Sequence, residues 1–241
     1  MIDIHCHLLP TLDDGSSNME ETKKMLSMAI EEGIDGIFAT SHFEYGMDAK
    51  WKHTYQKRFE EVQRYIENNN LPITLYEGSE IFYSDGIHSS LEETKLYTMN
   101  QTPYVLVEFP LYASFSFIER AVSNLIYGGY WPILAHVERY SALKDIQCVR
   151  ELVKKGACIQ VNASSIAGNR GWMLKYYCLH LMKNHLLHFV ATDAHGSDNR
   201  PPRVREAIAY MEKKMGKYYT RKIIERNPQR IMEGERIGGE N

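Results

Sequence analysis

Side chains that commonly bind divalent metal ions recur along the 241-residue chain. They are histidines and carboxylates, namely His5, His7, His42, Glu80, Glu108, His136, Asp193 and His195. Imidazole and carboxylate groups are ligands of manganese, iron, cobalt and zinc. His5 and His7 are two residues apart, as are Asp193 and His195, and this spacing places both side chains of a pair on one face of a strand. The pattern predicts a metal site.

The predicted elements place these residues at strand ends. Apolar segments typical of strands cover residues 2–7, 36–42, 73–81, 104–109, 132–137, 158–162 and 188–192. Amphipathic segments cover residues 18–32, 49–69, 115–127, 146–155, 172–184 and 203–215, with a last helix near 218–226. The first of these helices follows a predicted capping box, Ser17 with Glu20. Alternating strands and helices predict a parallel β/α barrel or a doubly wound sheet, and catalytic groups of barrels gather at the carboxyl ends of strands.

Each residue alone has a plainer interpretation. A histidine at a strand end is often a hydrogen-bonded core residue, Asp193 could cap a helix, and Glu80 could pair with a lysine. Eight such residues at strand ends favour the metal site. The remaining histidines are interpreted as structural: His53, His88, His180, His185 and His188. Cys6 is predicted to face away from the site as a small core residue.

Composition and cysteine spacing exclude several classes of protein. Lys and Arg total 28 and Asp and Glu total 31, without a basic stretch, so a nucleic-acid partner is not expected. No apolar run approaches the roughly 18 residues that span a bilayer, and no signal peptide is predicted. Four cysteines without a C-x-x-C pair indicate a reduced, cytoplasmic protein. No arginine stands six positions after any cysteine, which excludes a cysteine-dependent phosphatase.

Motifs from one end of the chain to the other resemble the PHP (polymerase and histidinol phosphatase) superfamily of metal-dependent phosphoesterases. They are D-I-H-C-H at His5, T-S-H at His42, E-G-S-E at Glu80, L-A-H-V-E-R at His136, A-T-D-A-H at Asp193 and the closing N-P-Q-R-I. L-D-D-G, E-F-P at Glu108, H-V-E-R-Y and R-P-P are most similar to the manganese-dependent protein-tyrosine phosphatases of bacterial capsule and exopolysaccharide loci.

The resemblance implies a fold and a ligand set. The fold would be a distorted (β/α)7 barrel in one domain, residues 1–241, with three divalent ions, manganese foremost and iron, cobalt or zinc as alternatives. One ion would be bound by His5, His7, Glu80 and Asp193, a second by Glu80, Glu108 and His136, and a third by Asp14, His42 and His195. Arg139 and Arg200 would contact the phosphate. Phe43 and Tyr45 are candidate contacts for the substrate ring or, equally, packing residues.

The implied activity is protein-tyrosine phosphatase (EC 3.1.3.48). The expected substrate is the phosphorylated, tyrosine-rich tail of a bacterial tyrosine kinase that controls capsule or exopolysaccharide synthesis, attacked by water that the metal ions activate, without a covalent enzyme intermediate. A small-molecule phosphomonoesterase similar to histidinol phosphatase and a non-catalytic PHP module are the alternatives. A nuclease is disfavoured by the net charge of −3.

Overall fold

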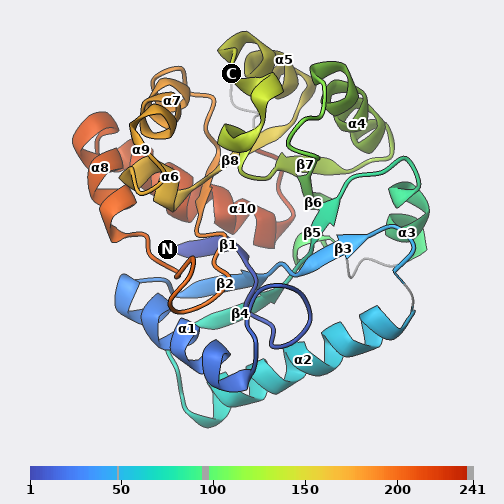
Figure 1. The fold of residues 1–241 in the computed structure, drawn as a ribbon, viewed down its shortest axis with the longest axis vertical. Helices are drawn as coiled ribbons and strands as arrows, with labels where there is room; N and C mark the ends of the chain where they lie inside the picture. The colour runs from blue at the N-terminus through green and yellow to red at the C-terminus, as the bar shows by residue number, and fades with distance from the viewer. Residues whose placement is uncertain (48, 94–97, 238–241) are drawn as a thin grey trace.

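Parallel β-strands lie at the centre of the molecule, and α-helices surround them (Figure 1). The computed structural model describes residues 1–47, 49–93 and 98–237. The strands are β1 (Ile2–Cys6), β2 (Gly36–Ala39), β3 (His42–Glu44), β4 (Thr74–Glu77), β5 (Glu80–Phe82), β6 (Tyr104–Glu108), β7 (Trp131–Leu134), β8 (Cys158–Asn162) and β9 (Phe189–Ala191). The α-helices are α1 (Met19–Glu32), α2 (Ala49–Asn68), α3 (Ile87–Glu93), α4 (Phe115–Tyr127), α5 (Ile146–Lys155), α6 (Ala163–Ala167), α7 (Trp172–Lys183), α8 (Arg205–Met215), α9 (Lys217–Arg221) and α10 (Asn227–Glu233).

The strands form two sheets, with the orders β1-β2-β4 and β3-β5-β6-β7-β8-β9. Neighbouring strands in both sheets are paired parallel, which agrees with the predicted alternation of strands and helices. Backbone hydrogen bonds join the two sheets just beyond β9: Asp193 N donates to His5 O at 2.8 Å, and His7 N donates to Ala194 O at 2.9 Å. These bonds bring the first and the last metal-ligand motifs side by side.

Two predicted strands are each split in two. Residues 36–42 form β2 and β3, and residues 73–81 form β4 and β5. The buried hydroxyl of Tyr55, from α2, donates to Ala39 O at 3.1 Å and accepts from Gly78 N at 3.0 Å, so it occupies backbone groups at both breaks. His42 and Glu80 therefore begin strands instead of ending them. They are still neighbours, because His42 pairs with Glu80 in the β3–β5 register.

The helices follow the predicted amphipathic segments closely. α4 and α5 have the predicted bounds. The cap of α1 was predicted one residue too early, because Asn18, and not Ser17, accepts the hydrogen bond from Glu21 N at 3.0 Å. The last predicted helix, near 218–226, corresponds to α9 and a π-helical turn (Lys222–Arg226), and α10 continues it beyond residue 226. α3 and α6 were not predicted, because helices of seven and five residues leave too short an apolar pattern.

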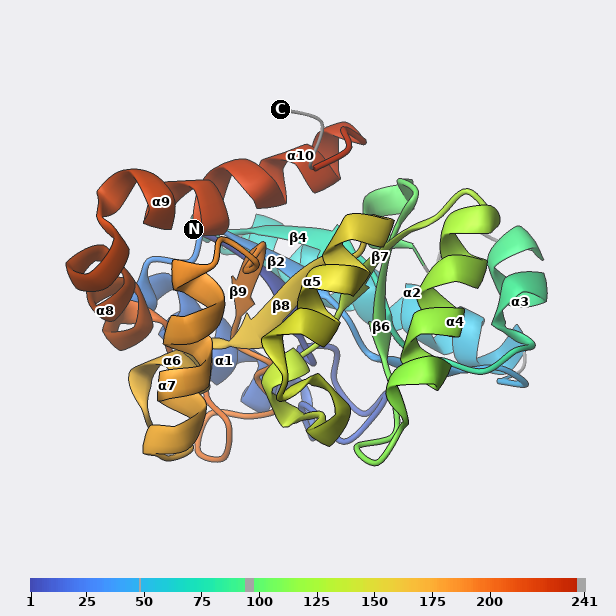
Figure 2. The same cartoon turned by 90° about the horizontal axis from the view of Figure 1, so that it is seen from above.

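The C-terminal segment closes the end of the strands that is remote from the predicted ligands. α10 lies across the strands in Figure 2, and its Ile231 joins a buried cluster with Ile4, Phe38 and Leu106. Tyr104, at the start of β6, donates a hydrogen bond to Glu235 O at 2.8 Å. The opposite ends of the strands are thus left for the site. Among the described residues, no helix combines the length and the apolar character needed to cross a membrane.

Candidate metal centre

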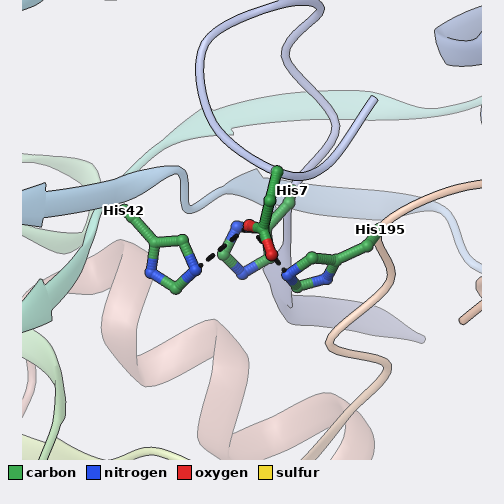
Figure 3. A group of neighbouring side chains, drawn as sticks. His7, His42 and His195 are labelled. Atoms are coloured by element: carbon green, nitrogen blue, oxygen red, sulfur yellow. Dashed lines mark ion pairs between the residues drawn. The ribbon is translucent and has the colours of Figure 1, made fainter. Parts of the chain in front are cut away.

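The nine side chains predicted to bind metal come together at one place in the fold. A cleft of about 230 Å³ is lined by seven of them and by two arginines: Asp14, His42, Glu80, Glu108, His136, Asp193 and His195, with Arg139 and Arg200. His5 and His7 lie fully buried beside it. Figure 3 shows the rings of His7, His42 and His195 converging on one point, although they come from three distant parts of the chain.

The imidazoles of His5, in β1, and of His7, just after it, face each other and two carboxylates. His5 Nε2 and His7 Nε2 are 3.2 Å apart. Asp193 Oδ1 lies 3.4 Å from the first and 3.6 Å from the second of these nitrogens. Glu80 lies 3.2 Å from each, through Oε1 to His5 and through Oε2 to His7. Donor atoms about 2.1 Å from one ion are themselves about 3 Å apart, so these contacts match the spacing of a shared ion.

Hydrogen bonds behind the rings fix which nitrogen faces the cleft. His7 Nδ1 is 2.8 Å from Asp13 Oδ2, and His195 Nδ1 is 3.1 Å from Asp193 O. His5 Nδ1 is 3.3 Å from the amide oxygen of Gln160, which also accepts from His136 N at 2.7 Å. These oxygens accept a hydrogen bond from Nδ1, so Nε2 is the ring nitrogen that faces the cleft and is available to a metal ion. Imidazole nitrogens and carboxylate oxygens in mutual contact are the donor set that divalent metal ions take, and the residues therefore fit such ions.

Four groups of ligand atoms are close enough to share an ion, with all atoms of a group within 4.8 Å of one another. They are His7, Asp14, His42 and His195; His5, His7 and Asp193; His5, Glu80 and His136; and His42, Glu80 and Glu108. The first group contains the predicted third ligand set with His7 added. Glu80 belongs to two groups, as a bridging carboxylate would. Glu108 belongs to the group of His42 and Glu80. The predicted second set instead placed Glu108 with His136, and these two side chains are 3.6 Å apart, from Glu108 Oε2 to His136 Nε2.

The charges in the site shift several pKa values. Burial alone would raise the pKa of Glu80, but the charge of His5 and a hydrogen bond from His136 hold it well below its usual range. Burial, together with the charges of His7 and Arg200, lowers the pKa of His195 to about 4. The neighbouring carboxylates act in the opposite direction on the imidazoles of His5 and His7 and raise their pKa values, so without metal these rings hold protons at positions where a bound cation would replace them.

Three polar residues that the sequence analysis did not select support the ligands. The Asp13 side chain is 5% exposed, and it accepts hydrogen bonds from His42 N at 3.0 Å and Gly15 N at 3.0 Å besides its contact with His7. Gln160 and Asn162 share one face of β8, where Asn162 Nδ2 donates to Asp193 Oδ2 at 2.7 Å. Two polar residues two apart in a fully buried strand were the signal that could have identified them.

Replacing Asp13 with asparagine is expected to weaken metal binding by about 10- to 100-fold, because the carboxylate that orients His7 and increases its basicity is lost. Metal affinity measured by competition with a chelator tests this expectation. Asp35→Asn is the matched control, since Asp35 is exposed and lies before β2, at the other end of the strand. Equal affinities for Asp13→Asn and Asp35→Asn would contradict the supporting role.

Three residues beside the cleft have the left-handed backbone conformation that non-glycine residues rarely adopt. The φ angles are 35° at His136, 53° at Asp193 and 56° at Arg200. His195 N donates to Arg200 O at 3.0 Å, which holds the loop after β9 in this form. Strained backbone of this kind gathers at functional sites, where the surrounding structure compensates for its cost.

The two predicted arginines border the candidate ligand Asp193. Arg139 Nη1 lies 3.7 Å from Asp193 Oδ2, and Arg200 Nη2 contacts the same oxygen. The predicted ring contacts have different positions. Phe43 is 1% exposed and packs against Trp51 at a ring distance of 5.2 Å, so it is a core residue and does not line the cleft. Tyr45 is 57% exposed and lies outside the residues that line the cleft.

Cys6 is a buried core residue, as predicted, and all four cysteines are free. Burial raises the pKa of the Cys6 thiol well above its ordinary value. A buried thiol that stays protonated is a poor nucleophile, so the chemistry of this site belongs to its imidazoles, carboxylates and arginines.

The sequence profile of the family described as "Capsular polysaccharide synthesis, CpsB/CapC" matches residues 1–233. The chain belongs to the CpsB/CapC family. The CpsB/CapC relatives include the tyrosine-protein phosphatase CpsB of Streptococcus pneumoniae, 31% identical over 238 residues that cover 96% of this chain and 98% of that protein. The tyrosine-protein phosphatase YwqE of Bacillus subtilis (strain 168) is 33% identical over 221 residues, 90% of this chain and 85% of that protein.

Solved structures agree with this assignment. A chain from the crystal structures of YwqE from Bacillus subtilis and CpsB from Streptococcus pneumoniae, described as unique metal-dependent tyrosine phosphatases, matches with a TM-score of 0.91 and 30% identity, over 99% of this chain and 96% of that chain. Histidinol phosphate phosphatase from Lactococcus lactis matches with a TM-score of 0.59 and 16% identity, over 89% of this chain and 93% of that chain, which shows a shared fold. The predicted resemblance to the capsule-locus phosphatases is confirmed.

Proposed function

We propose that the protein is a metal-dependent protein-tyrosine phosphatase (EC 3.1.3.48). The observation that carries the proposal is the convergence of nine imidazole and carboxylate side chains and two arginines in one cleft. Relatives in the CpsB/CapC family that bear the name tyrosine-protein phosphatase support the choice of reaction.

The proposed cofactor is a set of three divalent ions, with manganese foremost and iron, cobalt or zinc as alternatives. Bound there, the ions supply positive charge for the phosphate and lower the pKa of water to about 7–9, so that a nucleophile is present at neutral pH. Asp14, Glu80, Glu108 and Asp193 bring four negative charges, fewer than the positive charges of three divalent ions. The remaining positive charge favours a phosphate dianion.

The protein's own residues have distinct roles in the proposed reaction. Arg139 and Arg200 bind the phosphate oxygens, because a guanidinium forms paired hydrogen bonds with an anion. Asp13, Gln160 and Asn162 hold the ligands in place. The leaving phenolate has a pKa near 10, so it departs without a strong general acid. No side chain forms a covalent bond to the phosphoryl group.

The fold is proposed to be a distorted (β/α)7 barrel in one domain, residues 1–241. Counting β2 with β3 and β4 with β5 leaves seven strands of the described chain around one centre. The hydrogen bonds between β1 and the loop after β9 support closure of the ring. So does the shared cluster of Ile4, Phe38, Leu106 and Phe189 from strands of both sheets.

The proposed substrate is a phosphotyrosine in the tail of a bacterial tyrosine kinase that controls capsule or exopolysaccharide synthesis. The cleft lies at the mouth of the fold, where a flexible peptide has access, and Tyr45 remains a candidate contact for it. Four free cysteines support action in the reducing cytoplasm.

Two alternative functions can be distinguished from the proposed one by experiment. Hydrolysis of a small phosphomonoester such as histidinol phosphate is suggested by the shared fold of the Lactococcus lactis enzyme. A non-catalytic module is disfavoured, because each of the nine predicted ligands lies in the cleft or next to it.

Rates on three substrates test the proposal. With the manganese-loaded protein, kcat/KM for a phosphotyrosine peptide is expected to exceed kcat/KM for the matching phosphoserine peptide and for histidinol phosphate by at least about 10-fold, or about 1.4 kcal/mol. A preference for histidinol phosphate would show that the substrate is a small phosphomonoester and not a phosphotyrosine. Failure to hydrolyse any of the three would support the non-catalytic alternative.

Activity is further expected to require metal and not a thiol. EDTA should abolish hydrolysis and added manganese should restore it, whereas iodoacetamide and Cys6→Ser should leave most of the activity, since Cys6 is buried and its pKa is raised. Hydrolysis of the phosphotyrosine peptide after each treatment is the measurement. Inactivation by alkylation while the metal stays bound would show that a cysteine takes part.

A further inference from the structure

Two more cavities adjoin the metal cleft. One, of about 320 Å³, shares Arg139, Asp193 and Arg200 with the cleft. The other, of about 380 Å³, shares Asn162, Arg170 and Arg200 with the first. The shared lining residues place the three spaces next to one another, with Arg200 in the wall of each. The cleft accounts for the phosphate of one phosphotyrosine, so the two adjoining cavities have no assigned ligand.

Positive charge dominates the larger of these cavities, which four arginines and two glutamates line. Arg170 and Arg203 are exposed, and their side chains form no hydrogen bond or ion pair with any other residue in the described part of the chain. Glu32 is engaged locally, because its Oε2 accepts from Val204 N at 2.9 Å and Arg205 N at 2.8 Å. Glu206, the second glutamate, balances only part of the arginine charge.

The carboxylates of the smaller cavity are also engaged. Glu138 is buried, and its Oε1 accepts from Asn162 N at 3.0 Å and from Ser165 Oγ at 2.8 Å. Asp193 belongs to the metal centre and contacts Arg139 and Arg200. Arg170 is the arginine that lines both cavities and has no acidic partner among the described residues.

The local backbone holds Arg170 at this position. It lies in the turn between α6 and α7, with Gly168 at a φ of 99° and Gly171 at a φ of 103° on either side. These conformations suit glycine and fix the course of the turn. Arg203 also lines the larger cavity and belongs to the segment that leads into α8.

We propose that Arg170 and Arg203 form a second anion subsite, which binds a phosphate on another tyrosine of the same peptide while the first phosphotyrosine occupies the metal cleft. This inference rests on the proposed function. Guanidinium groups form paired hydrogen bonds with phosphate oxygens, and two of them match a dianion better than a carboxylate. Once the first phosphotyrosine is held, binding of the second phosphate is intramolecular and is favoured by its high effective concentration.

The test compares peptides that differ at one position. The set contains one phosphotyrosine with an unmodified tyrosine nearby, two phosphotyrosines, and one phosphotyrosine with a glutamate nearby, each made with several spacings. For the manganese-loaded wild type, KM is expected to be about 10-fold lower for the best doubly phosphorylated peptide than for its singly phosphorylated partner, and the glutamate peptide is expected to gain less. In Arg170→Ala and Arg203→Ala this KM ratio should fall toward one.

Arg64→Ala is the matched control. It removes one positive charge, as Arg170→Ala and Arg203→Ala do, but Arg64 is exposed on α2 and lines none of the three spaces. The control should keep the wild-type KM ratio. Equal KM values at every spacing, an equal gain with glutamate, or the same loss in Arg64→Ala would each overturn the subsite. Failure to hydrolyse even the singly phosphorylated peptide would instead overturn the proposed function.

Discussion

Replacing Glu80 with glutamine is expected to remove most of the bound metal and to lower kcat/KM by about 1000-fold or more, which is about 4 kcal/mol of transition-state stabilisation. The glutamine has nearly the same shape but lacks the charge. Glu80 Oε1 is 2.9 Å from His136 Nε2, and Glu80 Oε2 is 3.1 Å from His42 Nδ1, so one carboxylate serves two groups of ligands. Its loss should weaken two ions at once.

Asp14→Asn provides the comparison. The Asp14 side chain is 68% exposed and contacts His42 and His195 at 3.3 and 3.4 Å, within one ligand group. Its replacement should affect one ion and should lower metal content and kcat/KM less than Glu80→Gln does. Elemental analysis of both variants, alongside their kinetics on a phosphotyrosine peptide, is the measurement. A Glu80→Gln protein with the metal content of the wild type would disprove the bridging assignment.

The second large effect concerns the arginines. Arg139→Ala and Arg200→Ala are each expected to lower kcat/KM by about 10- to 1000-fold, or about 1.4–4 kcal/mol, with metal content near that of the wild type. A guanidinium binds the phosphate oxygens and cannot coordinate a cation. Lysine at either position should restore only part of the rate, because a single ammonium cannot reproduce the paired hydrogen bonds.

Both arginines contact Asp193, so metal content must be measured together with the kinetics. Steady-state rates on a phosphotyrosine peptide report on binding of the transition state, and inhibition by inorganic phosphate reports on binding of the product. Rates equal to those of the wild type in both alanine variants, with their metal retained, would show that neither arginine binds the phosphate.

Eight of the nine predicted metal ligands could be selected from sequence because their signal is local. The two-residue spacing of His5 and His7 fixes their common face, and the position of Glu108 at the end of an apolar segment fixes its place in the fold. The choice of Asp14 over Asp13 came from the resemblance. The two aspartates have different partners in the structure. Asp14 contacts His42 and His195, whereas Asp13 contacts Nδ1 of His7.

Other features depend on contacts between distant residues and left no local signal. The strand breaks arise because the hydroxyl of Tyr55 reaches Ala39 and Gly78, which are 16 and 23 residues away. Phe43 follows a candidate ligand, yet the strand geometry directs its ring into the core against Trp51. The anion subsite likewise combines Arg170 and Arg203, which come together only in the folded chain.

Reconstitution of the metal-free protein tests the central claim most directly. Manganese is added in increasing molar equivalents, and the initial rate on a phosphotyrosine peptide is measured together with the metal bound. If three ions at this cleft form the site, the rate should reach its maximum only as the third equivalent binds, and the same titration of Glu80→Gln should give little activity. A maximal rate with no bound metal, or full activity in Glu80→Gln, would contradict the account.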